Sequence, residues 1–304
     1  MSGTILRPWP NILGASTGGQ IKPQGIPQID WTHPLTRGLL FYAFDPGSAI
    51  PLDLVSGQVA VANATSGAAP TDVAWAFGQP RQYNAGNSWQ LQVNQPSFSG
   101  AVGSLVCGLY SPSPTVQVST GLFQYTTWTG SIGGTQVGYR DCEFVTSGGG
   151  GHLSCYGGLN GVNALFLSNT DGTPHLGSSV NDNFITLATV CSGTTRFTYG
   201  ASAANNILSQ GGTGGGGGAS SQADTTNMIA PFGLVSFGDY TSVTPAAPQA
   251  PYTGSVFYWG LWNRALSTDE ITYLHLDPYC FLIPAEPEMQ ALRLEQLMGQ
   301  IWLA

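Results

Sequence analysis

Short runs of apolar or alternating residues, separated by Gly, Asn, Asp, Ser and Pro, recur along the chain between residues 38 and 262. Within residues 72–78, for example, Val73, Trp75 and Phe77 fall on one face of a strand, because side chains alternate along an extended backbone. Regularly spaced short strands with such turn residues are typical of an antiparallel β-sandwich or jelly roll. We expect strands at residues 38–44, 58–63, 72–78, 88–93, 103–110, 120–128, 136–145, 152–159, 164–169, 183–191, 195–201, 232–239 and 254–262.

A helix-start signal follows the last of these runs. Ser267 and Glu270 have the spacing of a capping box, in which each side chain bonds a backbone N–H at the start of a helix. Leu266 and Ile271 flank this pair as an apolar staple, and Pro278 sets the end. The spacing predicts a short helix that starts at Ser267 and ends before Pro278.

Both ends of the chain depart from the strand pattern. Residues 1–32 interleave proline with glycine, which favours an extended arm, and residues 287–302 repeat apolar side chains near period 3.6, which predicts an amphipathic helix. We expect an arm at residues 1–32, a sandwich at 33–284 and a C-terminal helical segment at 285–304. Each terminal segment either packs on its own domain or docks on a neighbouring subunit. The side chains that would dock are Trp9, Ile12, Leu13, Ile21, Ile26, Trp31, Leu297, Ile301 and Trp302.

The charge content is unusually low for a chain with an apolar core. Hydrophobic residues make up 42% of the chain and charged residues only 8%, against about 25% charged in ordinary globular proteins. The net charge is −8 and no basic patch exists, so nucleic-acid binding is not expected. No leader peptide and no apolar stretch of the ~18 residues that span a bilayer are found, so membrane insertion is not expected either. A surface with few charges packs closely on neighbours, because little charge needs desolvation.

Nothing in the sequence predicts a metal or cofactor site. The glycine run at residues 211–218 lacks the Lys-Ser or Lys-Thr of a phosphate-binding loop. Four turn aspartates have oxygen ligands suited to calcium, but turn capping explains them better; they are Asp53, Asp171, Asp182 and Asp239. The cysteines are odd in number and form no C-x-x-C pair, so we expect reduced, buried thiols at Cys107, Cys142, Cys155, Cys191 and Cys280.

Three segments carry a family resemblance. GSVFYWGLWNRALSTDEI (254–271) resembles the closing strand and helix of concanavalin A-like, laminin-G-like lectin and glucanase domains, and IDWTHPLTRGLLFYAFDPG (29–47) resembles the openings of phage-encoded members. NFITLATVCSGTTRFTYGASA (183–203) is similar to the central hairpin, although GASAANN stands where the family usually has Asn-Gly. The resemblance covers roughly residues 29–284 and implies an all-β, concanavalin A-like sandwich of the tailed-phage virion type.

Because the family includes glucanases, which use catalytic carboxylates, we looked for such carboxylates in this sequence. Asp141 and Glu143 share one expected strand, but the third carboxylate of the family motif is missing and Arg140 lies beside them. Histidines occur at four scattered positions, without a nucleophile–histidine–acid pattern; they are His33, His152, His175 and His275. We therefore do not expect an enzyme.

Two functions remain open at this point. The first is a non-enzymatic virion structural protein, a capsid decoration, cement or head-fibre protein that is made in the host cytoplasm. It would bind other virion proteins, such as the major capsid protein or tail and fibre proteins, as a homo-oligomer such as a trimer. The second is a carbohydrate-binding lectin on a phage tail or cell surface. Its candidate glycan contacts, for which core or interface packing is the alternative, are Trp128, Tyr139, Tyr240 and Tyr252.

Overall fold

The computed structural model describes three continuous stretches, residues 27–44, 52–58 and 254–283, and a set of separate strands. Those strands lie at residues 61–62, 71–72, 81–83, 89–91, 102–111, 120–129, 135–147, 150–155, 165–168, 183–192, 195–202, 209–210, 222–223 and 232–237. Every strand pair in this part of the chain is antiparallel. The all-β, antiparallel class predicted from the sequence is therefore confirmed.

The first large sheet has the strand order β15-β14-β13-β8-β18-β2-β3, with β16 beside β14, β6 beside β18 and β5 beside β6. The strands at its centre come from the first, middle and last thirds of the chain, so the sheet is complete only when the C-terminal strand β18 is in place. Its strands are β2 (Leu39–Phe44), β3 (Leu52–Asp53), β5 (Thr71–Asp72), β6 (Arg81–Tyr83), β8 (Val102–Ser111), β13 (Asn183–Ser192), β14 (Thr195–Ser202), β15 (Ser209–Gln210), β16 (Gln222–Ala223) and β18 (Gly254–Trp262).

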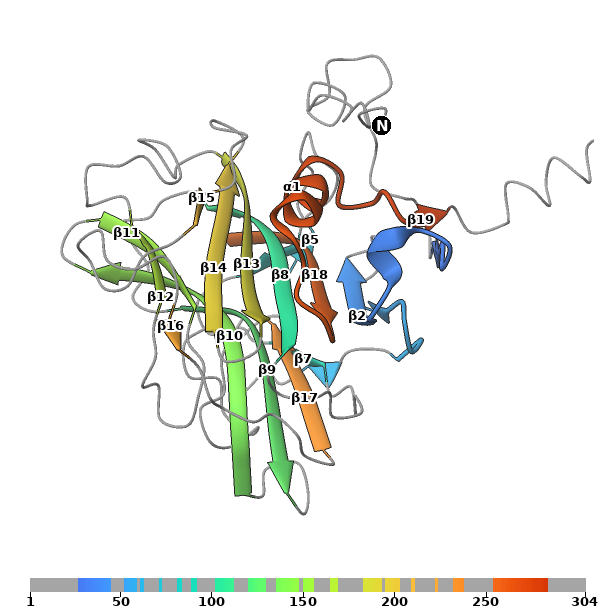
Figure 1. Cartoon of the computed structure of the whole chain (residues 1–304), viewed down its shortest axis with the longest axis horizontal. Coiled ribbons are helices and arrows are strands. Elements are labelled where there is room, and N and C mark those ends of the chain that lie inside the picture. Colours follow the sequence, from blue (N-terminus) through green and yellow to red (C-terminus); the bar gives the residue numbers. More distant parts are fainter. Residues whose placement is uncertain are drawn as a thin grey trace, which may run out of the picture.

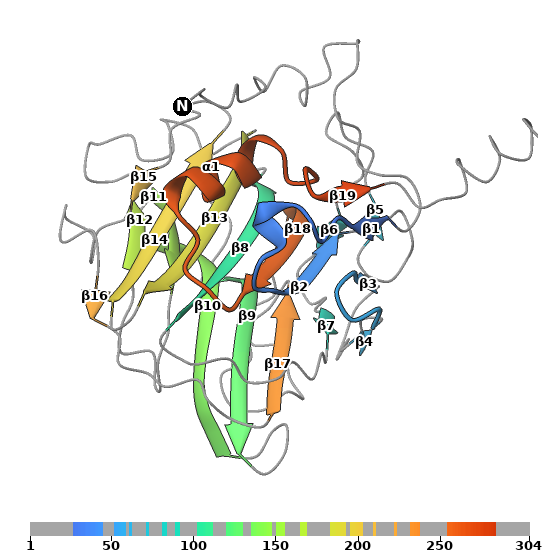
Figure 2. The ribbon, with the colours of Figure 1, turned by 45° about the vertical axis from the view of Figure 1, so that its right-hand side comes forward.

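The second large sheet has the order β12-β11-β10-β9-β17-β7-β4. Its strands are β4 (Val61–Ala62), β7 (Trp89–Leu91), β9 (Thr120–Thr129), β10 (Thr135–Ser147), β11 (Gly150–Cys155), β12 (Leu165–Ser168) and β17 (Phe232–Phe237). β10 contacts β8 and β13 of the first sheet, and the rings of Phe41 on β2 and Phe123 on β9 stack with centroids 6.0 Å apart. Figures 1 and 2 show the resulting two-layer arrangement. The predicted sandwich is thus present.

The central strand β18 is buried on both of its faces. Its register places Leu261 opposite Phe41 and Leu105, and all three are fully buried on the face where Phe41 meets the second sheet. On the other face, Gly260 lies opposite Tyr42 and Val106. The outer face of the first sheet must therefore be covered by something other than the second sheet.

That cover is supplied by the segments that flank β18 and β2. The helix α1 (Thr268–Leu276), the short 3-10 helix η2 (Pro34–Thr36) and the stretch after α1 pack on the outer face. The side chains that form this outer core include Leu35, Tyr42, Val106, Ala188, Tyr258, Trp262, Leu266, Ile271, Leu274 and Phe281. Burying aliphatic and aromatic groups on this scale stabilises the domain by roughly 1.5–3 kcal/mol for each fully buried side chain.

The capping box predicted for α1 is confirmed. Ser267 is the N-cap, its hydroxyl accepts from the Glu270 N–H, and the Glu270 carboxylate accepts from the Ser267 N–H. Leu266 and Ile271, the expected staple, are both buried in the outer core. The helix ends at Leu276, two residues before Pro278.

A third, very small sheet joins the two ends of the described domain. β1 (Gln28–Ile29) pairs with β19 (Leu282–Ile283), and the Asp30 N–H donates to the Phe281 carbonyl at 2.8 Å. β1 falls inside the segment expected to be an arm, and no strand was expected at either place. Gln28 and Ile283 thus lie opposite each other although they are far apart in the sequence.

Parts of the other predictions fall outside the described residues. Of the strand expected at residues 72–78, only Asp72 is described, as the second residue of β5, and residues 1–26 and the helix expected at 287–302 lie beyond the described ranges. In the part of the chain that the structure does describe, no helix has both the length and the hydropathy needed to cross a bilayer.

Candidate binding site

The first wall of the candidate site is η2, which His33 starts. The His33 side chain is the N-cap, with Nδ1 accepting from the Leu35 N–H at 3.3 Å, and Pro34 occupies the first helical position, where its missing N–H costs nothing. The Thr36 N–H and hydroxyl both donate to the His33 carbonyl, at 3.0 and 2.7 Å. The His-Pro-Leu-Thr sequence therefore folds locally into a rigid turn that presents an imidazole and a proline ring.

The second wall is the first half of α1, and Arg264 fixes it against η2. The Arg264 guanidinium donates to both carboxylate oxygens of Glu270, Nη1 to Oε2 at 2.7 Å and Nη2 to Oε1 at 2.6 Å. Its Nε donates to the Arg37 carbonyl at 2.7 Å. A single side chain thus connects the residue after η2 to the start of α1.

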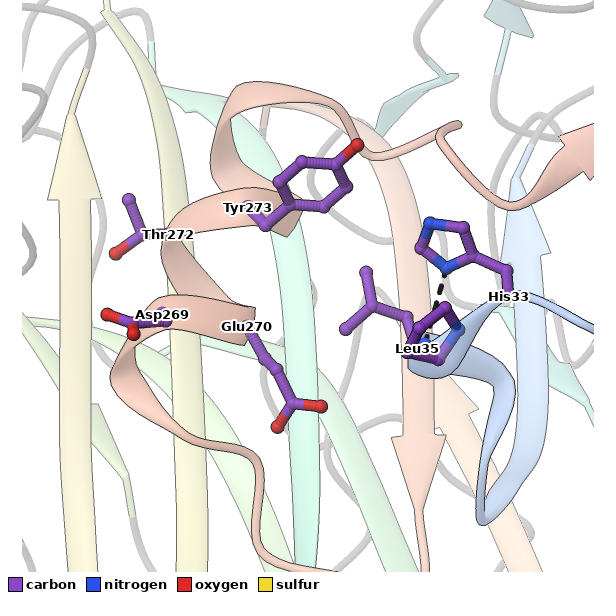
Figure 3. Close-up of a pocket in the computed structure, with 7 residues that line it drawn as sticks. His33, Leu35, Asp269, Glu270, Thr272 and Tyr273 are labelled. Atoms are coloured by element: carbon purple, nitrogen blue, oxygen red, sulfur yellow. Dashed lines mark hydrogen bonds between the residues drawn. The ribbon is translucent and has the colours of Figure 1, made fainter. Parts of the chain in front are cut away.

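A groove of about 560 Å³ lies between these walls. His33 and Tyr273 lie on its two sides, with ring centroids 6.1 Å apart and planes inclined by 24°. In Figure 3, Tyr273 and Glu270 extend from α1 toward η2, whereas Asp269 and Thr272 point to the other side of the view. The groove is lined by His33, Pro34, Leu35, Asp269, Glu270, Thr272 and Tyr273.

Two exposed apolar side chains stand beside the small sheet near this groove. Trp31 is 57% exposed and follows β1, and Ile283 is 46% exposed and ends β19. Large apolar side chains at the surface are most informative when they gather in one region. Trp31 and Ile283 therefore lie close to residues 27 and 283, the first and last residues that the structure describes.

The surroundings of His33 and Glu270 shift the pKa of each side chain. Burial lowers the pKa of His33, against the opposing charge of Asp30, so the neutral imidazole is favoured. Burial raises the pKa of Glu270, but the bonds from Arg264 and Ser267 outweigh it and keep the pKa below its usual value. Because both oxygens of Glu270 already accept hydrogen bonds, this carboxylate is a poor general acid or base.

Asp53 and His275, two polar residues considered above as candidate site residues, make structural contacts instead. Asp53 is fully buried and caps its turn: Oδ1 accepts from the N–H groups of Tyr42 and Val55, and Oδ2 from the N–H and hydroxyl of Ser56. Burial nevertheless raises the pKa of Asp53, with those bonds opposing it. The turn-capping interpretation of Asp53 is confirmed.

His275, like Asp53, makes contacts that hold the fold together. It is fully buried on α1, and its Nδ1 lies 2.9 Å from the Thr186 hydroxyl of β13. That hydroxyl is 3.3 Å from the hydroxyl of Tyr258 on β18. The chain of polar contacts joins α1 to the outer face of the first sheet. In the described ranges, no three His, Cys, Asp or Glu side chains gather in a group that could hold a metal ion.

The predicted thiols and carboxylates are described in part. Cys107 and Cys191 are buried, as expected, and Cys280 is half-buried, with burial raising the pKa of its thiol. Asp141 and Glu143 both lie in β10, but the pairing of β10 with β9 shifts register between Cys142 and Glu143. The residue skipped at this shift is Leu122 of β9, so the irregularity lies on the partner strand.

The groove was not predicted from the sequence, and the predicted binding residues do not form it. Trp31 is the described member of the docking set; the others, Trp9, Ile12, Leu13, Ile21, Ile26, Leu297, Ile301 and Trp302, lie outside the described residues. Trp128 and Tyr139 belong to β9 and β10 of the second sheet, whereas the groove lies over the first; Tyr240 and Tyr252 are outside the described ranges. The sequence feature that could have pointed to the groove is the pair of motifs at residues 29–47 and 254–271, because these two segments contain its two walls.

No family model and no curated protein matches the chain. Among solved structures, domain 4 of AbnA, a GH43 extracellular arabinanase from Geobacillus stearothermophilus in complex with arabinotriose, is 13% identical over 78% of this chain and 98% of its own, with a TM-score of 0.47. The enzymatically active domain of tailspike protein 2 of bacteriophage CBA120 is 9% identical over 91% and 34%, with a TM-score of 0.47. The receptor binding domain of botulinum neurotoxin D is 9% identical over 81% and 54%, with a TM-score of 0.48.

The chain thus spans about a third of the tailspike chain and about half of the toxin chain that it matches. At these identities and TM-scores, the similarity assigns neither an activity nor a ligand to the groove. What the chain itself establishes is an antiparallel β-sandwich with a covered outer face, which carries a groove between η2 and α1.

Proposed function

We propose that the chain is a non-enzymatic structural protein of a tailed-phage virion, a capsid decoration or head-fibre protein that binds neighbouring virion subunits. The observation that carries this proposal is the β1–β19 pairing. It brings Gln28 and Ile283 together, so the terminal segments 1–26 and 284–304 both leave the sandwich from one place. Exposed Trp31 and Ile283 stand at that place as apolar contacts for a partner.

The composition supports the same function. Only 8% of the residues are charged, so a large surface can be buried against neighbours without desolvating many charges. The terminal segments are rich in the apolar side chains that such an interface requires. The motif at residues 29–47, which resembles the openings of phage-encoded members of the family, favours the virion as the location. We propose assembly as a homo-oligomer, with a trimer as the simplest state for capsid and fibre sites.

The test is to locate the protein in particles. Mass spectrometry of purified virions of the phage that encodes the chain is expected to find it in many copies, and a particle reconstruction is expected to show the sandwich on the capsid or a head fibre. The β1–β19 end should face the particle. Absence of the chain from purified virions, at a sensitivity that detects minor tail proteins, contradicts the proposal.

Carbohydrate binding is the second candidate, and the groove favours it. Tyr273 and His33 offer rings that can stack on a sugar, and Asp269 offers a carboxylate for sugar hydroxyls. This function predicts glycan-array binding that Tyr273→Ala abolishes while Trp128→Ala and Tyr252→Ala leave it intact. Loss on mutating Trp128 or Tyr252 instead would place the glycan elsewhere, and absence of any binding would reject this candidate.

A further inference from the structure

We propose that the groove between η2 and α1 is the docking site for the N-terminal arm of a second copy of this chain. The inference deepens the proposed function, on which it rests, because it names the contact through which copies associate. The first step is the chemistry of the groove. Pro34, Leu35, His33 and Tyr273 give it an apolar and aromatic lining, and Asp269 places a carboxylate at the start of α1, beside the Glu270 carboxylate that Arg264 already pairs.

Such a lining fits a proline-containing peptide with a basic residue. Proline-rich segments dock in aromatic-lined grooves, since their extended conformation loses little entropy on binding. The arm contains two segments of this kind, Arg7-Pro8-Trp9-Pro10 and Ile21-Lys22-Pro23. The second contains Ile21 and is followed three residues later by Ile26, two of the side chains predicted to dock.

Charge selects the N-terminal arm over the other end of the chain. Residues 1–29 contain Arg7 and Lys22 and no Asp or Glu, in a protein whose net charge is −8. Residues 284–304 contain three glutamates and one arginine and would meet the Asp269 carboxylate of α1 with like charge. Complementary charge favours the arm as the occupant, and like charge disfavours the C-terminal segment.

The length of the arm allows it to reach a second copy. β1 is paired with β19, so the arm joins the domain at Pro27, next to the end of β19. Lys22 precedes Pro27 by five residues, which span at most about 18 Å. The 26 residues before Pro27 can extend up to about 90 Å, which is ample to reach a neighbour.

Carbodiimide crosslinking of the purified full-length chain tests this inference. The reagent joins an amine directly to a carboxylate, and Lys22 is the only lysine, so the amine partner is either Lys22 or the N-terminal amine, which peptide mass spectrometry distinguishes. We expect a covalent dimer in which mass spectrometry finds Lys22 joined to Asp269 of the other copy. Asp269→Asn should remove this crosslink, and Lys22→Arg should remove it while leaving the dimer in sedimentation experiments.

A blocking variant tests the groove without depending on the crosslink. Thr272 lines the groove on the same side of α1 as Asp269, so Thr272→Arg adds bulk and positive charge there and should weaken self-association about tenfold or more, because like charges at an interface repel. Asp277→Asn, on the other end of α1, is the matched control and should leave the dimer and the Lys22–Asp269 crosslink unchanged.

The inference is overturned by a crosslink confined to one chain, by Lys22 joined equally to other carboxylates with no effect of Asp269→Asn, or by self-association that Thr272→Arg leaves unchanged. A glycan that binds the groove of a monomeric chain also overturns it. None of these results depends on where the protein is found, so this inference can fail while the chain is still present in virions. Conversely, the crosslink can form in a protein that virions lack, which would reject the proposed function alone.

Discussion

Arg264 and Glu270 face each other through two nearly parallel hydrogen bonds, 2.7 and 2.6 Å long. The same guanidinium reaches the carbonyl of Arg37, and the same carboxylate caps the N–H of Ser267. The pair therefore joins three elements: the end of η2, the turn that leaves β18 and the start of α1. It also sets the width of the groove, since the groove lies between the two helices that it connects.

Replacing this arginine with lysine should destabilise the domain. A lysine carries one ammonium group and cannot make the two-point bond to Glu270 together with the bond to the Arg37 carbonyl. We expect Arg264→Lys to lower the free energy of unfolding by about 1–2 kcal/mol, measured by urea denaturation. Arg37→Lys is the control, because only the backbone carbonyl of Arg37 takes part, and it should be within about 0.5 kcal/mol of wild type. Equal stability of the two variants would show that the pair contributes little.

The indole of Trp262 makes a buried contact that a phenyl ring cannot replace. Its Nε1–H donates to the Leu35 carbonyl at 2.7 Å, and the side chain is fully buried. Trp262→Phe leaves that carbonyl without its donor and opens a space, so we expect a loss of about 2–4 kcal/mol. Thermal denaturation checks this, with Trp31→Phe as the control because Trp31 is exposed. A variant as stable as wild type would mean that water or a repacked neighbour replaces the indole.

Gly260 has no space for a side chain. A β-carbon there would collide with the ring of Trp262 and lie 3.2 Å from Cδ2 of Tyr42. We expect Gly260→Ala to cost about 1–3 kcal/mol through overpacking in a fully buried strand. Gly57→Asn is the control: the site is open and its φ of +71° is one that asparagine tolerates. Chemical denaturation of both variants should separate them clearly, and equal midpoints would contradict the packing argument.

His33 should make the domain sensitive to mild acid. Burial lowers its pKa in the folded state, while the unfolded chain has the ordinary value of about 6.5. The unfolded state therefore binds the proton more readily, and the stability that depends on neutral His33 is complete above about pH 6.5 and declines as the pH falls through the lowered value. The melting temperature of the wild type should fall between pH 7.5 and pH 5.

His33→Asn isolates this effect from other titrating groups. Asparagine is a good N-cap and can still accept from the Leu35 N–H, but it does not titrate. The variant should have a smaller decrease in melting temperature than wild type over the same range. If the two decreases coincide, His33 is not the group responsible.

The parts of the fold that local patterns determine could be predicted from the sequence. The long strands β8, β9, β13, β14 and β18 carry the alternation and β-branched content that define strands, and the capping box of α1 lies within four residues. Both are short-range properties. The burial of both faces of β18 agrees with its aromatic run Phe257-Tyr258-Trp259, which leaves no polar face.

The groove and the β1–β19 pairing could not be predicted in the same way. Strands of two residues have no periodicity to detect, and their pairing depends on where Gln28 and Ile283 meet after the whole sandwich has closed. The Arg264–Glu270 pair lies inside a motif that was noted only for its family resemblance. Its bond to the Arg37 carbonyl joins positions far apart in the sequence, which a single sequence does not reveal.

The pairing of Gln28 with Ile283 also determines how the domain would respond to tension. If the chain is held by residues that precede Gln28 and pulled by residues that follow Ile283, both forces act at the same end of the two-residue ladder. The hydrogen bonds would then break one after another, as in an opening zipper, instead of sharing the load in shear. The small ribbon would open at low force, and the load would pass inward to η2 and the end of α1, well before the long strands of the sandwich bear it.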